Sequence, residues 1–267
     1  MKRVRFRKME GAGNDYVFVD GIRDPFPMAR GPELAQRWSD RHFGIGGDGL
    51  IVLLRDPQAP VRMAMWNADG SRGAMCGNGL RCLAKLAAAH GHVTGPRFVV
   101  ETDAGLRPVE LLASGDVRTE LGTVTVAAPR RITVDDRSIE LWPGDAGNPH
   151  AVTFVADTEQ ADVLRLGEAL QHHPDFPGGV NVEFVQVLGP LRLRQRTYER
   201  GSGETLACGT GAAVAASAAR AAGLVGSLGD VQVELRGGTL RVQDDVGGLA
   251  IVGPARTVFT GEIELSE

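Results

Sequence analysis

Two cysteines stand where a glycine-rich turn leads into a run of small, mostly uncharged residues. They open the motifs Cys76-Gly77-Asn78-Gly79 and Cys208-Gly209-Thr210-Gly211. We predict that each run is a helix with its cysteine at the N-terminus, where free backbone N–H groups and the positive end of the helix dipole favour a thiolate. Such a cysteine can act as a base. Taken singly, either one is equally compatible with a small buried residue beside a glycine turn.

The spacing of the two motifs indicates an internal duplication. The cysteines are 132 residues apart (208 − 76), and other segments correspond at nearly the same spacing. Four matches in the same order predict two related halves, each with one cysteine. Residues that differ between the halves, Asn67 and Glu199 or Gly49 and Asn181, are candidates for contacts to an asymmetric ligand. Besides the cysteine motifs, the matching pairs are Trp66-Asn67-Ala68-Asp69-Gly70-Ser71 with Tyr198-Glu199-Arg200-Gly201-Ser202-Gly203, Gly47-Asp48-Gly49 with Gly179-Val180-Asn181, and Gly13-Asn14-Asp15 with Gly147-Asn148-Pro149.

The composition is that of an ordinary soluble chain. It has 267 residues, 43% of them hydrophobic and 23% charged, which is enough for two domains of about 130 residues each. The net charge of −4 gives no general attraction to nucleic acid or to an anionic membrane. No apolar signal core follows the basic start, and no uncharged run is long enough to span a bilayer, so we expect a cytoplasmic protein. Three cysteines do not make a disulfide framework.

Hydrophobic periodicity predicts mostly strands, with one apolar helix in each half. We therefore predict an α/β fold of two pseudo-symmetric halves, each a mixed, mostly antiparallel β-sheet curled around a central helix. The N-terminal half, residues 1–116, carries Cys76, and the C-terminal half, residues 117–256, carries Cys208. A last strand at about residues 257–267 is a candidate to return to the first half. The helices outside the Cys208 motif are predicted at residues 32–41, 80–90 and 159–171, and the clearest strands at 2–8, 16–19, 50–54, 61–65, 98–101, 106–112, 151–155, 180–188 and 191–198.

Two other kinds of site are not favoured by the pattern. The glycine string Gly44-Ile45-Gly46-Gly47-Asp48-Gly49 lacks the lysine of a phosphate-binding loop and leads into a strand rather than a helix. No metal site is predicted, because no Cys-x-x-Cys or paired histidine spacing surrounds a cysteine. The third cysteine, Cys82, is predicted to be a packing residue inside its helix.

The pairing of the cysteines favours a chemical role. Two cysteines in equivalent places of duplicated halves would face each other across a pseudo-twofold cleft. This arrangement suits the removal of a proton from a carbon by one thiolate while the opposite thiol donates a proton from the other face. We therefore predict proton transfer at a carbon atom for Cys76 and Cys208.

The chain resembles the diaminopimelate epimerase family from end to end. The resemblance implies a pyridoxal-independent amino-acid epimerase that interconverts LL- and meso-diaminopimelate in the synthesis of lysine and peptidoglycan precursors. It also implies that no cofactor is used and that the protein is a homodimer. The segments that carry the resemblance are Gly11-Ala12-Gly13-Asn14-Asp15, Asn67-Ala68-Asp69-Gly70-Ser71, Gly147-Asn148-Pro149-His150, Tyr198-Glu199-Arg200-Gly201-Ser202-Gly203-Glu204-Thr205 and the two cysteine motifs.

The same resemblance assigns roles to individual residues. Cys76 and Cys208 become the acid/base pair, and His150 and Glu199 the residues that assist them or orient their loops. Backbone N–H groups would hold the carboxylate of the reacting centre at two helix N-termini, and Arg200 suits a bidentate grip on the distal carboxylate. Some family members have glutamine where this chain has Gly49, so Gly49 is left out of the site. The expected substrate contacts are Asn14, Asn67, Gly77, Asn78, Asn148, Asn181, Glu199, Arg200, Gly209 and Thr210.

Three alternatives compete with this interpretation. A proline racemase or hydroxyproline epimerase would also use paired cysteines, but its substrate has one carboxylate and gives Arg200 and the asparagines less to bind. A thiol–disulfide redox or binding protein would use Cys76 and Cys208 as a switch. A structural relative without activity is disfavoured because both cysteines and both glycine turns are present.

Overall fold

The computed structural model describes residues 2–134 and 137–265. The chain divides into two compact units. The N-terminal unit runs to Thr119 and includes the segment from Gly253 onward, and the C-terminal unit comprises Glu120–Val252.

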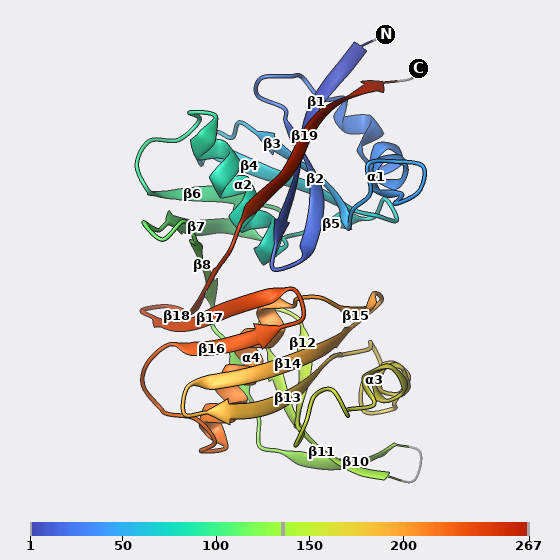
Figure 1. Ribbon diagram of the computed structural model, residues 1–267, viewed down its shortest axis with the longest axis vertical. Coiled ribbons are helices and arrows are strands. Elements are labelled where there is room, and N and C mark those ends of the chain that lie inside the picture. Colours follow the sequence, from blue (N-terminus) through green and yellow to red (C-terminus); the bar gives the residue numbers. More distant parts are fainter. Residues whose placement is uncertain (1, 135–136, 266–267) are drawn as a thin grey trace. The chain divides into compact units, whose positions relative to one another are not determined.

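The N-terminal unit is a mixed sheet with two helices. Strand β1 (Lys2–Gly11) pairs antiparallel with β2 (Asn14–Asp20) and with the last strand, β19 (Arg256–Leu265), which runs beside it in Figure 1. The helices are α1 (Gly31–Ser39), preceded by a 3-10 turn at Met28–Arg30, and α2 (Gly77–Ala89). The other strands are β3 (Gly49–Leu54), β4 (Val61–Asn67), β5 (Arg72–Gly73), β6 (Arg97–Thr102), β7 (Gly105–Leu111) and the start of β8 (Val117–Gly122).

Strand β3 is buried on both of its faces. Its side chains alternate, so that Ile51 and Leu53 pack in the same cluster as Leu80 and Leu83 of α2. Leu50 and Val52 point to the other face, in the cluster that contains Trp38 of α1. A strand that is covered on both faces reads as a continuous apolar run, which is the pattern seen at residues 49–54.

The C-terminal unit repeats this plan. Its helices are α3 (Val163–Gln171) and α4 (Gly209–Ala221), and the first residues of α2 and α4 are 132 positions apart (209 − 77). Strand pairing also repeats: β12–β13 is parallel like β2–β3, and β14–β16 is parallel like β4–β6. The strands are β9 (Thr125–Val126), β10 (Arg130–Val134), β11 (Arg137–Asp145), β12 (Pro149–Phe154), β13 (Asn181–Gly189), β14 (Arg192–Glu199), β15 (Gly203–Thr205), β16 (Val231–Leu235), β17 (Gly238–Asp245) and β18 (Gly248–Gly253).

Helix α4 is the central helix of its unit. Its residues from Ala212 to Ala216 are all fully buried, so the helix is apolar around its whole circumference. A Cβ added at Gly144 of β11 would lie 2.4 Å from the side chain of Val214, which shows how closely the helix approaches that strand. The prediction of a mixed, mostly antiparallel α/β fold with one buried helix per half is confirmed.

Some predicted boundaries were wrong. Residues 9–11 were expected in a loop but continue β1, because they pair with both β2 and β19. Helix α3 begins at Val163 rather than near Glu159, whose backbone N–H instead binds the Asp157 carboxylate in a local turn that competes with helix. The division of the units after Thr119 lies close to the expected boundary at residue 116. Residues 266–267 of the expected last strand lie outside the described residues.

Candidate active site

Cys76 lies at the start of α2, as the sequence predicted. Its backbone is extended, and its Sγ accepts a hydrogen bond from the Gly79 N–H at 3.4 Å, so the sulfur caps the helix. The thiol also donates to Oδ1 of Asn14, at 3.2 Å. Burial raises the pKa of Tyr16 well above its usual value, and the charge of Cys76 and a hydrogen bond with its sulfur raise it further. The helix start therefore holds a half-buried thiol among groups that can respond to its ionisation.

Asn14 is held from its other side by an ionic network. Its Nδ2 donates to Asp48 Oδ2 at 2.5 Å, and Arg41 donates to the other Asp48 oxygen at 2.9 Å. Arg41 also binds Asp15, whose carboxylate is 2.6 Å from the buried Lys8 ammonium. Burial opposes ionisation of Asp15, but hydrogen bonds from Arg41 and Lys8 lower its pKa on balance. The network fixes the Asn14 amide and with it the oxygen that faces Cys76.

Asn67 ends β4, opposite Gly49 in the register of β3 and β4. Its side-chain amide donates to Ser71 Oγ at 2.9 Å and closes the turn that follows the strand. A Cβ at Gly49 would lie 2.2 Å from the Trp66 carbonyl oxygen, so this backbone has no room for a side chain there. The presence of glycine at position 49 therefore has a steric reason.

Cys208 occupies the equivalent place at the start of α4. Its Sγ accepts from the Gly211 N–H at 3.4 Å and lies 3.4 Å from Thr210 Oγ1. The expectation of a favoured thiolate is wrong for this cysteine. Burial raises its pKa well above the usual value, and the negative charges of Glu199 and Glu183 raise it further. Hydrogen bonds from Thr210 and Gly211 lower it by less, so the thiol form is favoured.

A buried histidine–carboxylate pair lies beside Cys208. His150 Nδ1 is 2.8 Å from Glu183 Oε1, and both side chains are 0% exposed. The other ring nitrogen lies 3.0 Å from Asn148 Oδ1. One potential ligand atom each from His150, Glu183 and Cys208 lies within 4.8 Å of the others. Sequence spacing gave no sign of this cluster, because its members come from three separate elements.

Glu199 and Arg200 follow at the end of β14. Burial raises the pKa of Glu199, which accepts a hydrogen bond from the Thr205 hydroxyl and one from Cys208. Asn181 uses its side chain within the protein: Oδ1 accepts from the Arg200 N–H at 3.0 Å, and Nδ2 donates to the Pro149 carbonyl at 2.9 Å. The Arg200 guanidinium is exposed and binds Gly178 O at 3.4 Å. Among the predicted site residues, Arg200 thus places its charged group in contact with solvent.

The two helix starts differ in what packs beneath them. A Cβ on Gly79 would lie 2.5 Å from the Ile51 side chain, and one on Gly211 would lie 2.4 Å from the Glu183 carboxylate. Ile51 and Glu183 are themselves 132 residues apart (183 − 51), so they occupy equivalent positions. An apolar side chain therefore supports Cys76 where a buried carboxylate supports Cys208.

A second cluster in the N-terminal unit was not foreseen from the sequence. His90 Nδ1 and His92 Nε2 lie 2.6 and 2.7 Å from the same Asp20 oxygen. Arg7 Nη2 is 3.0 Å from His90 Nε2, and a guanidinium can only donate, so the His90 proton lies on Nδ1 and points to Asp20. The cluster is thus a closed hydrogen-bond group that ties the end of α2 to β2.

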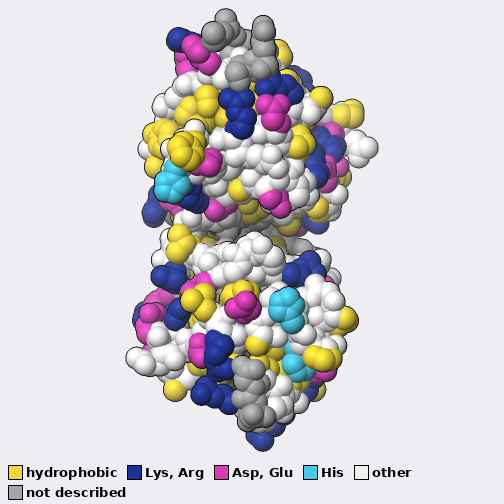
Figure 2. All heavy atoms as spheres, turned by 90° about the vertical axis from the view of Figure 1, so that its right-hand side faces the viewer, with side chains coloured by type: hydrophobic (Ala, Val, Ile, Leu, Met, Phe, Trp, Pro, Cys, Tyr) yellow, Lys and Arg dark blue, Asp and Glu magenta, His cyan; other side chains and the backbone are white. Residues whose placement is uncertain are grey.

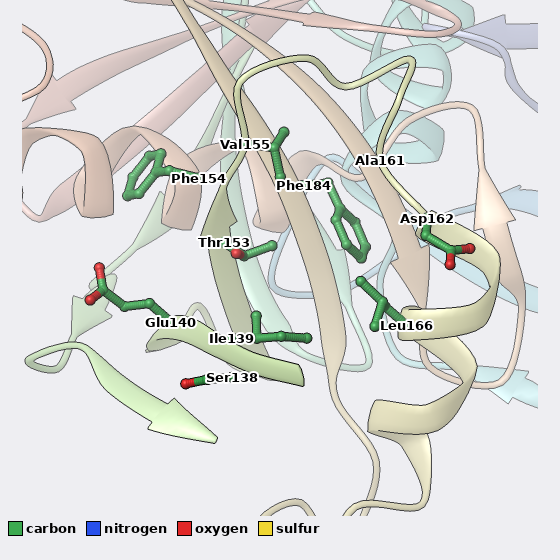
Figure 3. Close-up of a pocket in the computed structure, with 10 residues that line it drawn as sticks. All are labelled: Ser138, Ile139, Glu140, Thr153, Phe154, Val155, Ala161, Asp162, Leu166 and Phe184. Atoms are coloured by element: carbon green, nitrogen blue, oxygen red, sulfur yellow. The ribbon is translucent and has the colours of Figure 1, made fainter. Parts of the chain in front are cut away.

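A hollow of about 310 Å³ lies elsewhere in the C-terminal unit, between β11, β12 and α3 (Figure 3). Phe184 and Leu166 point into it, with Glu140 and Asp162 at its margin. None of the residues predicted for the site lines this hollow. It is therefore separate from the helix start at Cys208.

The described surface shows mixed charge, and the described helices show no membrane-spanning character. On the face shown in Figure 2, acidic and basic side chains are interspersed over both units. Among the described residues, no helix has both the length and the apolar character needed to cross a membrane.

Comparison with known proteins decides the family. The family model described as diaminopimelate epimerase matches residues 6–127 and 144–260. The chain belongs to this family. A "Diaminopimelate epimerase" of Thermosynechococcus vestitus is 44% identical over 97% of this chain and 99% of its own length. A protein of the same name from Leptospira biflexa is 38% identical over 98% of this chain and 100% of its own.

Solved structures show that the fold is shared more widely than the family. A Bacillus anthracis phenazine biosynthesis protein of the PhzF family matches with a TM-score of 0.77 at 16% identity, over 99% of this chain and all of its own. A probable proline racemase from Agrobacterium radiobacter matches with a TM-score of 0.71 at 18% identity, over 98% of this chain and 93% of its own. At these identities the likeness concerns the fold of this family member and not its substrate.

Proposed function

We propose that this chain is a diaminopimelate epimerase that interconverts LL- and meso-diaminopimelate without a cofactor, with Cys76 and Cys208 as its two acid/base groups. Family membership supports the substrate. The observation that carries the mechanism is the equivalent placement of the cysteines: each is the first capping residue of a 13-residue helix, and the two helices begin 132 residues apart. A catalyst that inverts a carbon needs one proton donor and one acceptor of this kind.

The helix starts would also hold the carboxylate of the reacting carbon. Backbone N–H groups at Gly77 and Asn78 of α2, and at Gly209 and Thr210 of α4, lie in the first turn of their helices, where the helix dipoles are positive and favour an anion. The same groups stabilise the negative charge that spreads into the carboxylate as the α proton leaves. The chain's own dipoles would then do the work of an electron sink.

The cysteines are suited to different resting roles. Cys208 is 5% exposed and its carboxylate neighbours favour the thiol, so it is ready to donate a proton. Glu199 and the His150–Glu183 pair would then adjust the charge around it as the proton moves. Cys76, whose thiol donates to the Asn14 side-chain oxygen, would be the first acceptor. Asn14, Asn67, Asn148 and Asn181 are proposed to orient the substrate directly or through their turns.

The substrate assignment is tested with purified protein and two kinds of amino acid. We expect conversion of LL-diaminopimelate to the meso isomer without added pyridoxal phosphate, and no conversion of L-proline or trans-4-hydroxy-L-proline. Chiral chromatography measures both reactions. The competing assignment deserves a test because a probable proline racemase and a hydroxyproline epimerase share the fold. Turnover of proline with none of diaminopimelate would reverse the proposal.

Arg200 is proposed to hold the distal carboxylate. Arg200→Met should raise KM for diaminopimelate through loss of a charge-assisted hydrogen bond, on the order of 1.5–3 kcal/mol if the bound contact is dry. The change should be smaller for an analogue that lacks the distal carboxylate. Arg192→Met, which removes an exposed arginine paired with Glu234 in the same unit, is the matched control and should leave KM unchanged. Equal losses for substrate and analogue would contradict this role.

The assembly and location of the protein are also proposals. We expect a homodimer in the cytoplasm, as the family resemblance suggests. Light scattering coupled to size-exclusion chromatography measures the mass against 28.3 kDa for one chain, and cell fractionation measures the location. A monomer that is fully active would exclude a functional need for the dimer.

A further inference from the structure

Arg81 is a buried cation that the proposed mechanism does not yet use. It lies on α2 and is 0% exposed. Its Nη2 donates to Asn78 Oδ1 at 2.6 Å, its Nε to the Pro254 carbonyl at 3.2 Å and its Nη1 to the Gly77 carbonyl at 3.5 Å. Across residues 2–134 and 137–265, no carboxylate lies within ion-pair distance of it. The negative charges of Asp116 and Glu10 act on it without direct contact. Burying a charge that has no directly paired counter-ion is costly, which suggests that Arg81 has a role.

The hydrogen bonds of Arg81 lead to the Cys76 thiol. Because the guanidinium only donates, it fixes the Asn78 amide with its oxygen toward Arg81 and its NH₂ group toward Asn14. Asn78 Nδ2 then donates to Asn14 Oδ1 at 3.3 Å, the same oxygen that accepts from Cys76. Arg81 therefore fixes the orientation of the Asn78 amide, and through it supports the orientation of Asn14 that Asp48 also sets and the direction of the thiol.

The charge of Arg81 also acts on Cys76. When the thiol loses its proton, the negative sulfur faces the Asn14 oxygen, which is unfavourable unless positive charge offsets it. Burial lowers the pKa of Arg81, whereas the ionised forms of Cys82, Cys76, Asp116 and Glu10 raise it, so the guanidinium interacts electrostatically with the Cys76 sulfur when that sulfur is negative. Cys82 stays a thiol at neutral pH, because burial raises its pKa to about 12.

The equivalent position in the C-terminal unit carries no cation. The residue 132 positions after Arg81 is Ala213, a fully buried alanine. Cys208 has buried carboxylates as neighbours instead. The cysteines of the two units thus have neighbouring charges that differ in sign: the cation of Arg81 acts on Cys76, and the carboxylates of Glu199 and Glu183 act on Cys208.

We propose that Arg81 is a positioning residue for Cys76: it fixes the Asn78–Asn14 chain that holds the thiol, and its charge offsets the negative sulfur when the proton leaves. The inference deepens the proposed function, because it concerns the ionisation of one of the two proposed acid/base groups. It predicts that Arg81 acts on Cys76 and not on Cys208.

The test measures how fast iodoacetamide alkylates each cysteine as a function of pH, with mass spectrometry to distinguish the sites. Arg81→Gln removes the charge and keeps a donor. We expect the midpoint of Cys76 alkylation to rise by about one pH unit, equivalent to about tenfold slower reaction at neutral pH. The Cys208 profile should stay unchanged. Arg81→Lys restores a positive charge, and its Cys76 midpoint should lie between wild type and Arg81→Gln.

Lys85→Met is the matched control for a merely structural role. Lys85 lies one turn further along α2 and ties the helix to the same segment by donating to the Ala255 carbonyl at 2.9 Å; it also donates to the Gly115 carbonyl at 3.2 Å. It should leave both alkylation profiles unchanged. An unchanged Cys76 midpoint in Arg81→Gln, or equal shifts at Cys76 and Cys208, would overturn the proposal. If Arg81→Gln does not fold, as judged by circular dichroism, Arg81→Lys decides by the same criteria.

The readout separates this inference from the proposed function. Alkylation needs no substrate, so a Cys76-specific shift supports the positioning role even if diaminopimelate is not converted. Failure of the shift in an enzyme that does convert diaminopimelate would remove Arg81 alone. In active enzyme, Arg81→Gln should lower kcat more than it raises KM, because the effect concerns proton transfer.

Discussion

Cys76→Ala and Cys208→Ala should each lower the rate of epimerisation by on the order of 10³-fold or more, because each removes one of the two groups that move the proton. Epimerisation needs both a donor and an acceptor in every turnover, so the loss should appear in both directions of the reaction. Chiral chromatography of diaminopimelate isomers measures it. Substantial turnover by either variant would exclude a mechanism with two essential cysteines.

The folded structure should survive both substitutions. Each sulfur accepts one weak hydrogen bond from a helix N–H, and replacing such a cap by alanine costs about 1 kcal/mol. Circular dichroism and the melting temperature check this. Cys82→Ala is the matched control, since Cys82 is buried in the same apolar cluster as Leu80 and Leu83 of α2 and is proposed to take no part in proton transfer. It should keep most of the activity, even if the free energy of unfolding falls.

The parts of the site that depend on local sequence could be predicted. A cysteine followed by Gly-x-Gly and a run of small residues indicates a helix start, and both α2 and α4 begin one residue after their cysteine. The offset of 132 residues predicted the repeat because the start of α2 lies 28 residues after the start of β3 (77 − 49), and the start of α4 lies 28 residues after the start of β13 (209 − 181). Helix starts and repeats can be predicted from the sequence because they depend on residue types and spacing along the chain.

The parts that depend on contacts between distant elements could not. Asn14 meets Asn78 and Asp48 only because β2 brings it beside α2 and the loop before β3. The burial of Glu183 beside His150 follows from the parallel register of β12 and β13, which pairs His150 with Asn181, two residues before Glu183. Residue types alone do not show which charged groups will be buried together. For the same reason Arg81 reads in the sequence as an ordinary helical arginine.

The surroundings of Cys208 correct the expectation that every cysteine at a helix N-terminus is a thiolate. A helix N-terminus favours a thiolate, but that effect is typically below about 1 kcal/mol at an exposed end. At Cys208 burial and two carboxylates act in the opposite sense and outweigh it. A thiol is nevertheless what a proton donor requires, so the corrected ionisation state still fits a reaction that uses one acceptor and one donor.

The largest qualitative effect is expected when the reaction is run in D₂O. With LL-diaminopimelate as the starting isomer and short reaction times, the meso product should carry deuterium at the inverted carbon, while recovered starting material stays nearly unlabelled. The reason is that the donor thiol has exchanged with solvent before substrate binds, whereas the abstracted proton remains on the other cysteine. This holds if bound substrate is shielded from water during the two transfers.

A single base that served both faces would give a different pattern. It would return solvent-derived deuterium to the original face as well as to the inverted one, so both isomers would be labelled from the outset. Mass spectrometry of the separated isomers distinguishes the two cases, and Cys82→Ala should reproduce the wild-type pattern. Equal early labelling of product and recovered substrate would contradict the two-base role of Cys76 and Cys208. Label in the product alone would instead identify two separate proton carriers, which is the role that the two capping cysteines are proposed to fill.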